Sequence, residues 1–171
     1  LSAKGLVLDL RDNQDGLLSS AVDIASAFLE NGVVLYEQFG DGTEEVFEAS
    51  GTFLGYRGTL VVLVNENSAS ASELVTGAWQ DAGVATLVGT TTFGKGTVQV
   101  QNQLVNGGGL RLTIDRWLTP NRNSIHQIGI TPDVIVEWPE DLREANPDLD
   151  PQLDAALEFI FQQNGQSAMA K

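Results

Sequence analysis

Apolar runs and amphipathic stretches alternate along the chain. Two runs, residues 5–10 and 59–64, are almost uninterrupted by polar side chains and are typical of strands buried on both faces. After the first run, apolar residues recur with the helical period at Leu17, Ala21, Ile24, Ala25 and Phe28. This spacing predicts a helix with one apolar face, which Asn31-Gly32 can end.

Shorter segments alternate between apolar and polar residues in the β period. Residues 33–39 and 45–49 flank Gly40-Asp41-Gly42, and residues 97–104 and 110–117 flank a glycine-rich turn at 106–109. Each pair is typical of a β-hairpin. Residues 134–138 are expected to form a last strand, followed by an acidic linker that contains proline.

The centre of the chain predicts a strand-helix-strand unit. The apolar run at 59–64 leads into a helix at 70–82, which Gly83 can end, and residues 84–88 return as a strand. Near the C-terminus, Asp150-Pro151 supplies an N-cap and a proline at the first helical position. The residues Leu153, Ala156, Leu157 and Ile160 would form one face of this last helix. The alternation predicts an α/β fold, and 171 residues with 42% hydrophobic content fit one domain, 1–171.

Charge and composition exclude several classes of partner. With 9 Lys and Arg against 23 Asp and Glu, the formal charge is −14, which argues against a nucleic-acid partner and disfavours anionic lipid. The chain has no cysteine, so thiol catalysis and cysteine-ligated metal are excluded. The acidic runs Glu140-Asp141 and Asp148-Leu149-Asp150 lack metal-binding spacing. We therefore expect no metal and no cofactor.

Candidate chemistry concentrates in residues 65–99. Three serines, Ser68, Ser70 and Ser72, stand at the start of the predicted helix, and Lys95 lies between two glycines, 25 residues beyond Ser70. A serine nucleophile needs a base, and the only histidine is His126. Without cysteine, the known arrangements left are a pair built on that imidazole and a Ser-Lys dyad.

Two other interpretations of this stretch stay open. Ser70 and Glu73 have capping-box spacing, which explains a serine at a helix start without any catalysis. The run from Gly89 to Gly94-Lys95 resembles a phosphate-binding P-loop, although Gly96 stands where Ser or Thr would bind magnesium. A lysine acts as a base only when it is neutral, which burial favours. Phe93 could supply an apolar wall, whereas a solvated turn lysine would be no base.

Three blocks of sequence resemble the carboxyl-terminal processing proteases, also called tail-specific proteases, which are serine peptidases with a Ser-Lys dyad. The first block is Leu8-Asp9-Leu10-Arg11-Asp12-Asn13-Gln14-Asp15-Gly16-Leu17-Leu18. The second is the serine and lysine stretch at 65–99. The third is Ser124-Ile125-His126-Gln127-Ile128-Gly129-Ile130-Thr131-Pro132-Asp133. Their order and spacing match the family over nearly the whole chain.

The resemblance implies a role for each matching residue. Ser70 would be the nucleophile, Lys95 the general base and Gln99 the residue that orients the lysine amine. The backbone N–H groups of Gly16 and Ala71 would form the oxyanion hole. Asp81 matches a family aspartate with a supporting role at most. In the oxyanion loop, Gln14 replaces the usual proline and Asp15 replaces the first glycine of a pair.

The resemblance also implies an architecture and a setting. We expect a crotonase/ClpP-like core of β-β-α units with a mixed sheet and packed helices. The chain would be the part of a protease domain that follows the PDZ insertion, with the PDZ domain and N-terminal portion absent, and alone it would be inactive or weak. The implied location is extracytoplasmic, in the periplasm or cell envelope.

The implied partners are unstructured protein or peptide substrates cleaved near the C-terminus, and a homo-oligomer is compatible with the pattern. No nucleic acid, metal or nucleotide is required. The main alternative is a non-catalytic interaction or scaffold relative with the same fold, for which Gln14 and Asp15 are the best support. A P-loop-like nucleotide-binding domain is the less favoured alternative.

Overall fold

The computed structural model describes residues 3–146 and 148–169. The elements follow in the order β1 (Gly5–Asp9), α1 (Leu18–Phe28), β2 (Val33–Phe39), β3 (Glu44–Glu48), β4 (Thr59–Val64), α2 (Ala71–Asp81), β5 (Ala85–Gly89), β6 (Thr97–Gln103), β7 (Gly109–Leu118), β8 (Val134–Ile135), α3 (Glu140–Ala145) and α4 (Pro151–Met169). Among the described helices, none is both long and apolar enough to cross a membrane.

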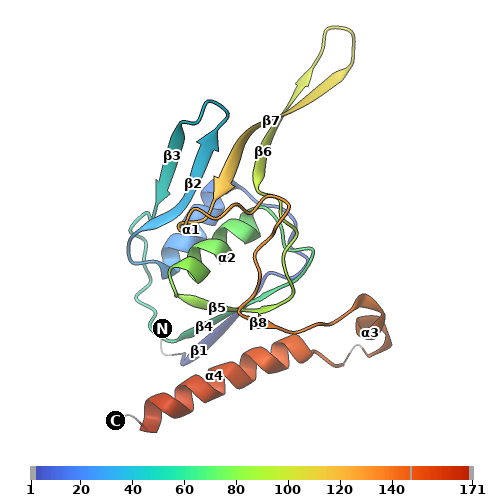
Figure 1. Cartoon of the computed structure of the whole chain (residues 1–171). Coiled ribbons are helices and arrows are strands. Elements are labelled where there is room, and N and C mark those ends of the chain that lie inside the picture. Colours follow the sequence, from blue (N-terminus) through green and yellow to red (C-terminus); the bar gives the residue numbers. More distant parts are fainter. Residues whose placement is uncertain (1–2, 147, 170–171) are drawn as a thin grey trace.

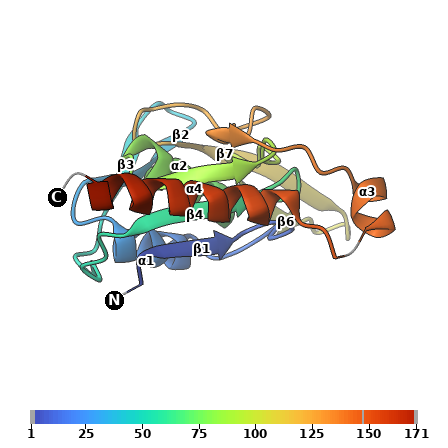
Figure 2. The same ribbon diagram turned by 90° about the horizontal axis from the view of Figure 1, so that it is seen from below.

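A parallel sheet with the order β1-β4-β5-β8 forms the base of the molecule. Helices α1 and α2 cover one face, and α4 runs across the other, mainly along β4 (Figures 1 and 2). Alternate residues of β4 therefore pack into two hydrophobic cores, one on each face of the parallel sheet. Val62 and Val64 pack towards α1 and α2, whereas Val61 and Leu63 pack against Ala156 and Ile160 of α4. This burial on both faces explains the continuous apolar run of β4.

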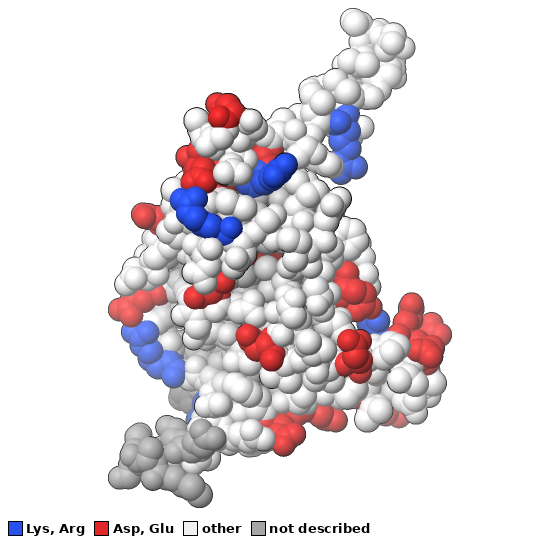
Figure 3. Space-filling model, in the orientation of Figure 1, with Lys and Arg blue, Asp and Glu red and all other residues white. Residues whose placement is uncertain are grey.

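An antiparallel sheet with the order β3-β2-β7-β6 lies on the far side of α1 and α2 (Figure 1). Trp79 of α2 is fully buried between these layers, and its Nε1 donates a hydrogen bond to the Ala25 carbonyl at 3.0 Å. The β6–β7 hairpin extends beyond the body, and its outer part is free of charge, while acidic side chains are scattered over the body (Figure 3).

The predicted elements are largely confirmed, and the α/β class is confirmed. The structure realises this class as one parallel and one antiparallel sheet. Strand β8 is shorter than the expected 134–138, and α3 occupies a segment that we expected to be a linker. Helix α3 has no buried residue, so it carries no apolar periodicity from which it could be predicted.

The buried face of α4 differs in part from the expected one. Leu157 is 39% exposed, while Gln152, which has no place on an apolar face, is only 2% exposed. Gln152 Nε2 donates to the Val136 carbonyl at 2.9 Å, and its Oε1 accepts from Arg11 Nη1 at 3.2 Å. These bonds satisfy the amide, which is the condition for burying it.

We predict that Ile160→Ala lowers the free energy of unfolding by about 2–4 kcal/mol, because it leaves a cavity between α4 and β4. Phe161→Ala is the matched control: Phe161 is the next residue on the same helix and is 71% exposed. Its loss should change stability by less than about 0.5 kcal/mol. Chemical denaturation of both variants measures the difference, and equal losses would show that α4 does not dock through Ile160.

Candidate active site

Ser70 occupies an unusual backbone position at the entrance to α2. A short turn connects the end of β4 to this residue, which is the N-cap of the helix and has φ 58° and ψ −117°. Such a conformation costs a residue with a side chain roughly 1–3 kcal/mol, and it persists only where the surroundings enforce it. Ser70 is 6% exposed. A strained, nearly buried serine at a helix N-terminus is suited to a nucleophile, because the adjacent N–H groups point towards the reacting centre.

The expected capping box between Ser70 and Glu73 is present. Glu73 Oε2 accepts the Ser70 N–H at 3.1 Å, and the Glu73 N–H donates to the Ser70 carbonyl at 2.9 Å. The Ser70 side chain completes the box by facing the Glu73 N–H. A hydroxyl that accepts an N–H keeps its own proton, so this arrangement leaves the Ser70 hydroxyl able to give that proton to a base.

Glu73 is the residue whose importance sequence reasoning missed. Its side chain is fully buried, and besides the Ser70 N–H it accepts hydrogen bonds from the Thr92 hydroxyl at 2.5 Å, the Gly94 N–H at 2.7 Å and the Lys95 N–H at 2.8 Å. A buried carboxylate is tolerated only when such donors replace water. These bonds join the turn that carries Lys95 to the backbone of Ser70.

The loop after β1 is fixed to the serine turn by two side chains. Asp12 Oδ1 accepts from the amides of Asn65 and Asn67, each at 2.9 Å. The Asn13 side-chain amide donates to the Ser72 hydroxyl at 2.8 Å, and that hydroxyl donates to the Asn13 backbone carbonyl at 3.0 Å. The two parts of the expected oxyanion hole therefore come from segments that are tied together.

Gly16 lies directly against Ala71. A Cβ atom placed on Gly16 would be 2.6 Å from the Ala71 Cβ, which is closer than two carbon atoms can approach. Only glycine fits this position without a shift of the backbone. The structure thus brings together the two residues whose N–H groups the resemblance assigns to the oxyanion hole.

Lys95 lies in a different setting from the one expected. Its Nζ forms an ion pair with Asp15 Oδ1 at 2.6 Å, and its side chain is 39% exposed. Phe93 is 65% exposed and does not wall off the amine. Within the described residues, Lys95 Nζ has no hydrogen bond to Ser70 Oγ. The expectation that the Lys95 amine is desolvated is therefore wrong for this arrangement, because the amine is partly exposed and paired with the Asp15 carboxylate.

Two further predicted site residues lie away from Ser70. Gln99 is exposed on β6, where its Nε2 donates to the Thr113 hydroxyl at 3.2 Å instead of contacting Lys95. A register shift between Val98 and Gln99 changes the direction of the strand there. Asp81 stands at the C-terminal end of α2, about 16 Å along the helix from Ser70, and accepts the Asn121 N–H at 2.8 Å. Among the described residues, neither has a hydrogen bond to the serine or the lysine, although Gln99 and Lys95 line the same cavity, of about 680 Å³.

The geometry does not favour the alternatives to a Ser-Lys site, which are a phosphate-binding loop, a Ser-His pair and a metal site. The N–H groups of Gly94 and Lys95 are bound to Glu73 and are not free to cradle a phosphate, and the next element is strand β6. His126 packs across the 94–96 turn, and its Nδ1 is buried with no partner among residues 3–146 and 148–169. It forms no pair with a serine there. In the same part of the chain, no group of three His, Cys, Asp or Glu residues is arranged to hold a metal.

Two cavities are lined by the sequence neighbours of Ser70, one by Ala69 and the other by Ala71. One, of about 270 Å³, is lined by Gln14, Asp15, Asn67, Ala69, Phe93 and Lys95. The other, of about 210 Å³, passes Gly16 and Ala71 and is lined mainly by apolar side chains, among them Leu8, Leu10, Ala21, Ile24 and Val75. Asp15 borders both cavities. A polypeptide bound across Ser70 could therefore place side chains on each side of the nucleophile.

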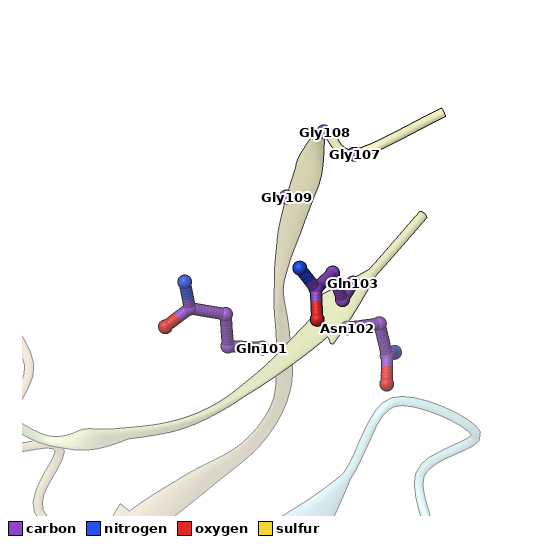
Figure 4. Close-up of a pocket in the computed structure, with 6 residues that line it drawn as sticks. All are labelled: Gln101, Asn102, Gln103, Gly107, Gly108 and Gly109. Carbon is purple, nitrogen blue, oxygen red and sulfur yellow. The ribbon is translucent and has the colours of Figure 1, made fainter. Parts of the chain in front are cut away.

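A further cavity, of about 440 Å³, lies in the β6–β7 hairpin and is lined only by amides and glycines (Figure 4). The side chains of Gln101 and Asn102 point to opposite sides of β6. Gln101 is six residues beyond Lys95, or about 20 Å along an extended strand. With no titratable side chain, this cavity is not a catalytic candidate.

We predict that Glu73→Gln lowers the free energy of unfolding by about 2–4 kcal/mol, because an amide NH₂ would face N–H donors in a buried site. Glu48→Gln removes an exposed carboxylate from β3 and should cost less than about 0.5 kcal/mol. Thermal and chemical denaturation of both variants measure the effect. A Glu73→Gln protein as stable as the Glu48→Gln control would show that the four hydrogen bonds are not formed.

We predict that the Asp12 contribution to stability disappears in acid. Hydrogen bonds from the Asn67 and Asn65 amides hold the pKa of the Asp12 carboxyl below its ordinary value. Stability from a lowered pKa is fully present above the unfolded value of about 3.9 and is lost as the pH falls through the folded value.

Asp12→Asn tests this dependence, because asparagine tolerates the φ of 59° at this position. The difference in free energy of unfolding between wild type and variant should be largest near neutral pH and shrink towards about pH 2. A difference that stays constant or grows in acid would rule out the Asp12 carboxylate as the group responsible.

Comparison with known proteins shows which family this chain resembles. Residues 1–136 match the family model of Peptidase family S41. The carboxyl-terminal-processing protease of Synechocystis sp. is 43% identical over 159 residues, which cover 92% of this chain and 37% of that protein. The carboxy-terminal processing protease CtpA of Bacillus subtilis is 38% identical over 139 residues, which cover 81% of this chain and 30% of that protein.

A solved structure also resembles this one. The photosystem II D1 C-terminal processing protease superposes with a TM-score of 0.73 at 36% identity, over 78% of this chain and 35% of that chain. The chain spans about a third of the length of the two curated relatives. The resemblance of the three sequence blocks is confirmed, and this chain belongs to peptidase family S41.

Proposed function

We propose that this chain carries the nucleophile and the base of a serine endopeptidase that cleaves proteins near their carboxyl termini. The observation that carries the proposal is the connection made by Glu73 between the strained Ser70 and the turn that holds Lys95. The names of the relatives support processing of carboxyl termini.

In the proposed mechanism, Lys95 in its neutral form takes the proton of the Ser70 hydroxyl as the serine oxygen attacks a peptide carbonyl. The N–H groups of Gly16 and Ala71 stabilise the oxyanion, and their close contact supports this role. Lys95 then protonates the leaving amine, and water hydrolyses the acyl-enzyme. Because Lys95 is paired with Asp15 in this structure, its amine must leave that partner before the first step.

The cavities suggest the kind of polypeptide that binds. The apolar cavity beside Gly16 and Ala71 is small, about 210 Å³, and suits a small apolar side chain next to the scissile bond. The cavity on the other side combines the exposed Phe93 ring with Asn67 and the Asp15–Lys95 pair. An extended, unstructured segment could lie across both, whereas folded backbone could not bring a carbonyl to Ser70.

The second candidate function is a non-catalytic interaction module with the same fold. The ion pair between Lys95 and Asp15 favours it, because a paired ammonium has no lone pair with which to accept the serine proton. The two functions differ in one readout, the cleavage of an unfolded polypeptide by the full-length protein. No cleavage by the wild type would favour the interaction module.

Ser70→Ala is predicted to lower proteolysis of an unfolded polypeptide such as casein by at least about a thousandfold in the full-length protein. Stability should fall by no more than about 1 kcal/mol, the typical cost of losing the part of a serine hydroxyl in a capping box. Ser68→Ala is the control for a nearby serine that is hydrogen-bonded to the Leu10 carbonyl. Turnover retained in Ser70→Ala would move the nucleophile elsewhere or exclude serine chemistry.

Lys95→Arg is predicted to be as damaging to turnover as Lys95→Ala. A guanidinium keeps the positive charge but cannot lose its proton in a protein, so it cannot act as the base. Initial rates of polypeptide cleavage by the two variants, compared at equal concentration, test this. Substantial activity in the arginine variant would mean that the lysine acts only through its charge and would exclude the dyad.

A further inference from the structure

The segment from Gln14 to Gly16 has only one polar tether among the described residues. Residues on its N-terminal side are fixed by Asp12 and Asn13, and α1 begins at Leu18 on the other side. Between them, the backbone of Gln14, Asp15 and Gly16 is exposed and enters no hydrogen bond within the described chain. The ion pair from Asp15 to Lys95 is the polar contact that holds this segment in place.

Two different carboxylates hold the backbone and the side chain of Lys95, and its amine has two competing roles. Its backbone N–H is fixed by Glu73 at 2.8 Å, so the turn is held close to Ser70, while its side chain reaches Asp15 at 2.6 Å. One lysine amine cannot be an ammonium paired with a carboxylate and also the neutral acceptor of the serine proton. The ammonium must first leave Asp15 and release its proton to solvent.

The oxyanion donor is on the same segment as this carboxylate. Gly16 follows Asp15 directly and lies against Ala71, beside Ser70. A peptide carbonyl that accepts a hydrogen bond from the Gly16 N–H would therefore pull on the same segment that the Asp15–Lys95 ion pair holds in place. Movement of this one segment on binding would free the Lys95 amine.

We propose that Asp15 is a positioning residue that holds Lys95 away from Ser70 in the resting state, and that binding of an extended polypeptide at Gly16 breaks this ion pair. The proposal rests on the proposed peptidase function. It assigns a role to the one carboxylate of the Gln14–Gly16 segment.

The expected effect is modest because the pair is exposed. The Asp15 side chain is 79% exposed and that of Lys95 is 39% exposed. Exposed ion pairs shift an equilibrium by about twofold to fivefold, and salt weakens them. Because substrate binding breaks the pair, removing the carboxylate should raise kcat/KM by about twofold to fivefold at low salt, mainly by lowering KM.

The test measures kcat and KM for cleavage of casein by the full-length wild type and by Asp15→Asn, Asp15→Glu and Asp23→Asn. Asp15→Asn removes the charge, Asp15→Glu keeps it, and Asp23→Asn removes an equal charge from the exposed surface of α1. Each protein is measured between about 0.02 M and about 0.5 M salt, over which screening becomes strong. Circular dichroism melting confirms that all four are folded.

We expect Asp15→Asn to have a higher kcat/KM than wild type at low salt and to lose the rise in kcat/KM that salt produces in wild type. Asp23→Asn should keep the wild-type kcat/KM and salt response within about twofold, and Asp15→Glu, which retains the charge, should retain the salt response. An unchanged or lower kcat/KM in Asp15→Asn, or a change confined to kcat, would overturn the role of Asp15. Lack of cleavage by every variant, including wild type, would instead refute the peptidase function itself.

Discussion

The buried carboxylate of Glu73 is the interaction on which the candidate site depends. A charged group with no exposed surface needs its hydrogen bonds filled, and Glu73 takes its donors from Ser70, Thr92, Gly94 and Lys95. Because one carboxylate binds donors so far apart in sequence, neither the serine turn nor the lysine turn can shift without leaving it unsatisfied. Its position on α2 thus sets the distance between the two candidate catalytic segments.

The same network explains why three separate blocks of sequence carry the family resemblance. Asn13 and Ser72 connect the first block to the second through paired hydrogen bonds. Thr92 donates to Glu73 and accepts the Ile130 N–H at 2.7 Å, which connects the second block to the third. The blocks meet around the entrance to α2, so each block supplies part of one site.

Local patterns were enough to predict most elements, but not the partners of the polar residues. The apolar run of β4 and the periodicity of α2 are local, and the structure has both. Local spacing identifies Glu73 only as a capping residue, because its donors beyond Ser70 lie about 20 residues away in sequence. Glu73 is the one charged residue in the stretch 67–80, and this is the signal that could identify it. The partner of Lys95 lies 80 residues away, and spacing alone could not reveal it.

The distance from Ser70 Oγ to Lys95 Nζ in a crystal structure of the full-length protein with a bound peptide aldehyde would test the account most directly. The account predicts a covalent bond from Ser70 Oγ to the aldehyde carbon, its oxygen at the Gly16 and Ala71 N–H groups, and Lys95 Nζ within about 3 Å of Ser70 Oγ. The Asp15 carboxylate would no longer contact the amine. An unmodified Ser70, or a Lys95 that stays on Asp15 beside a modified serine, would contradict it.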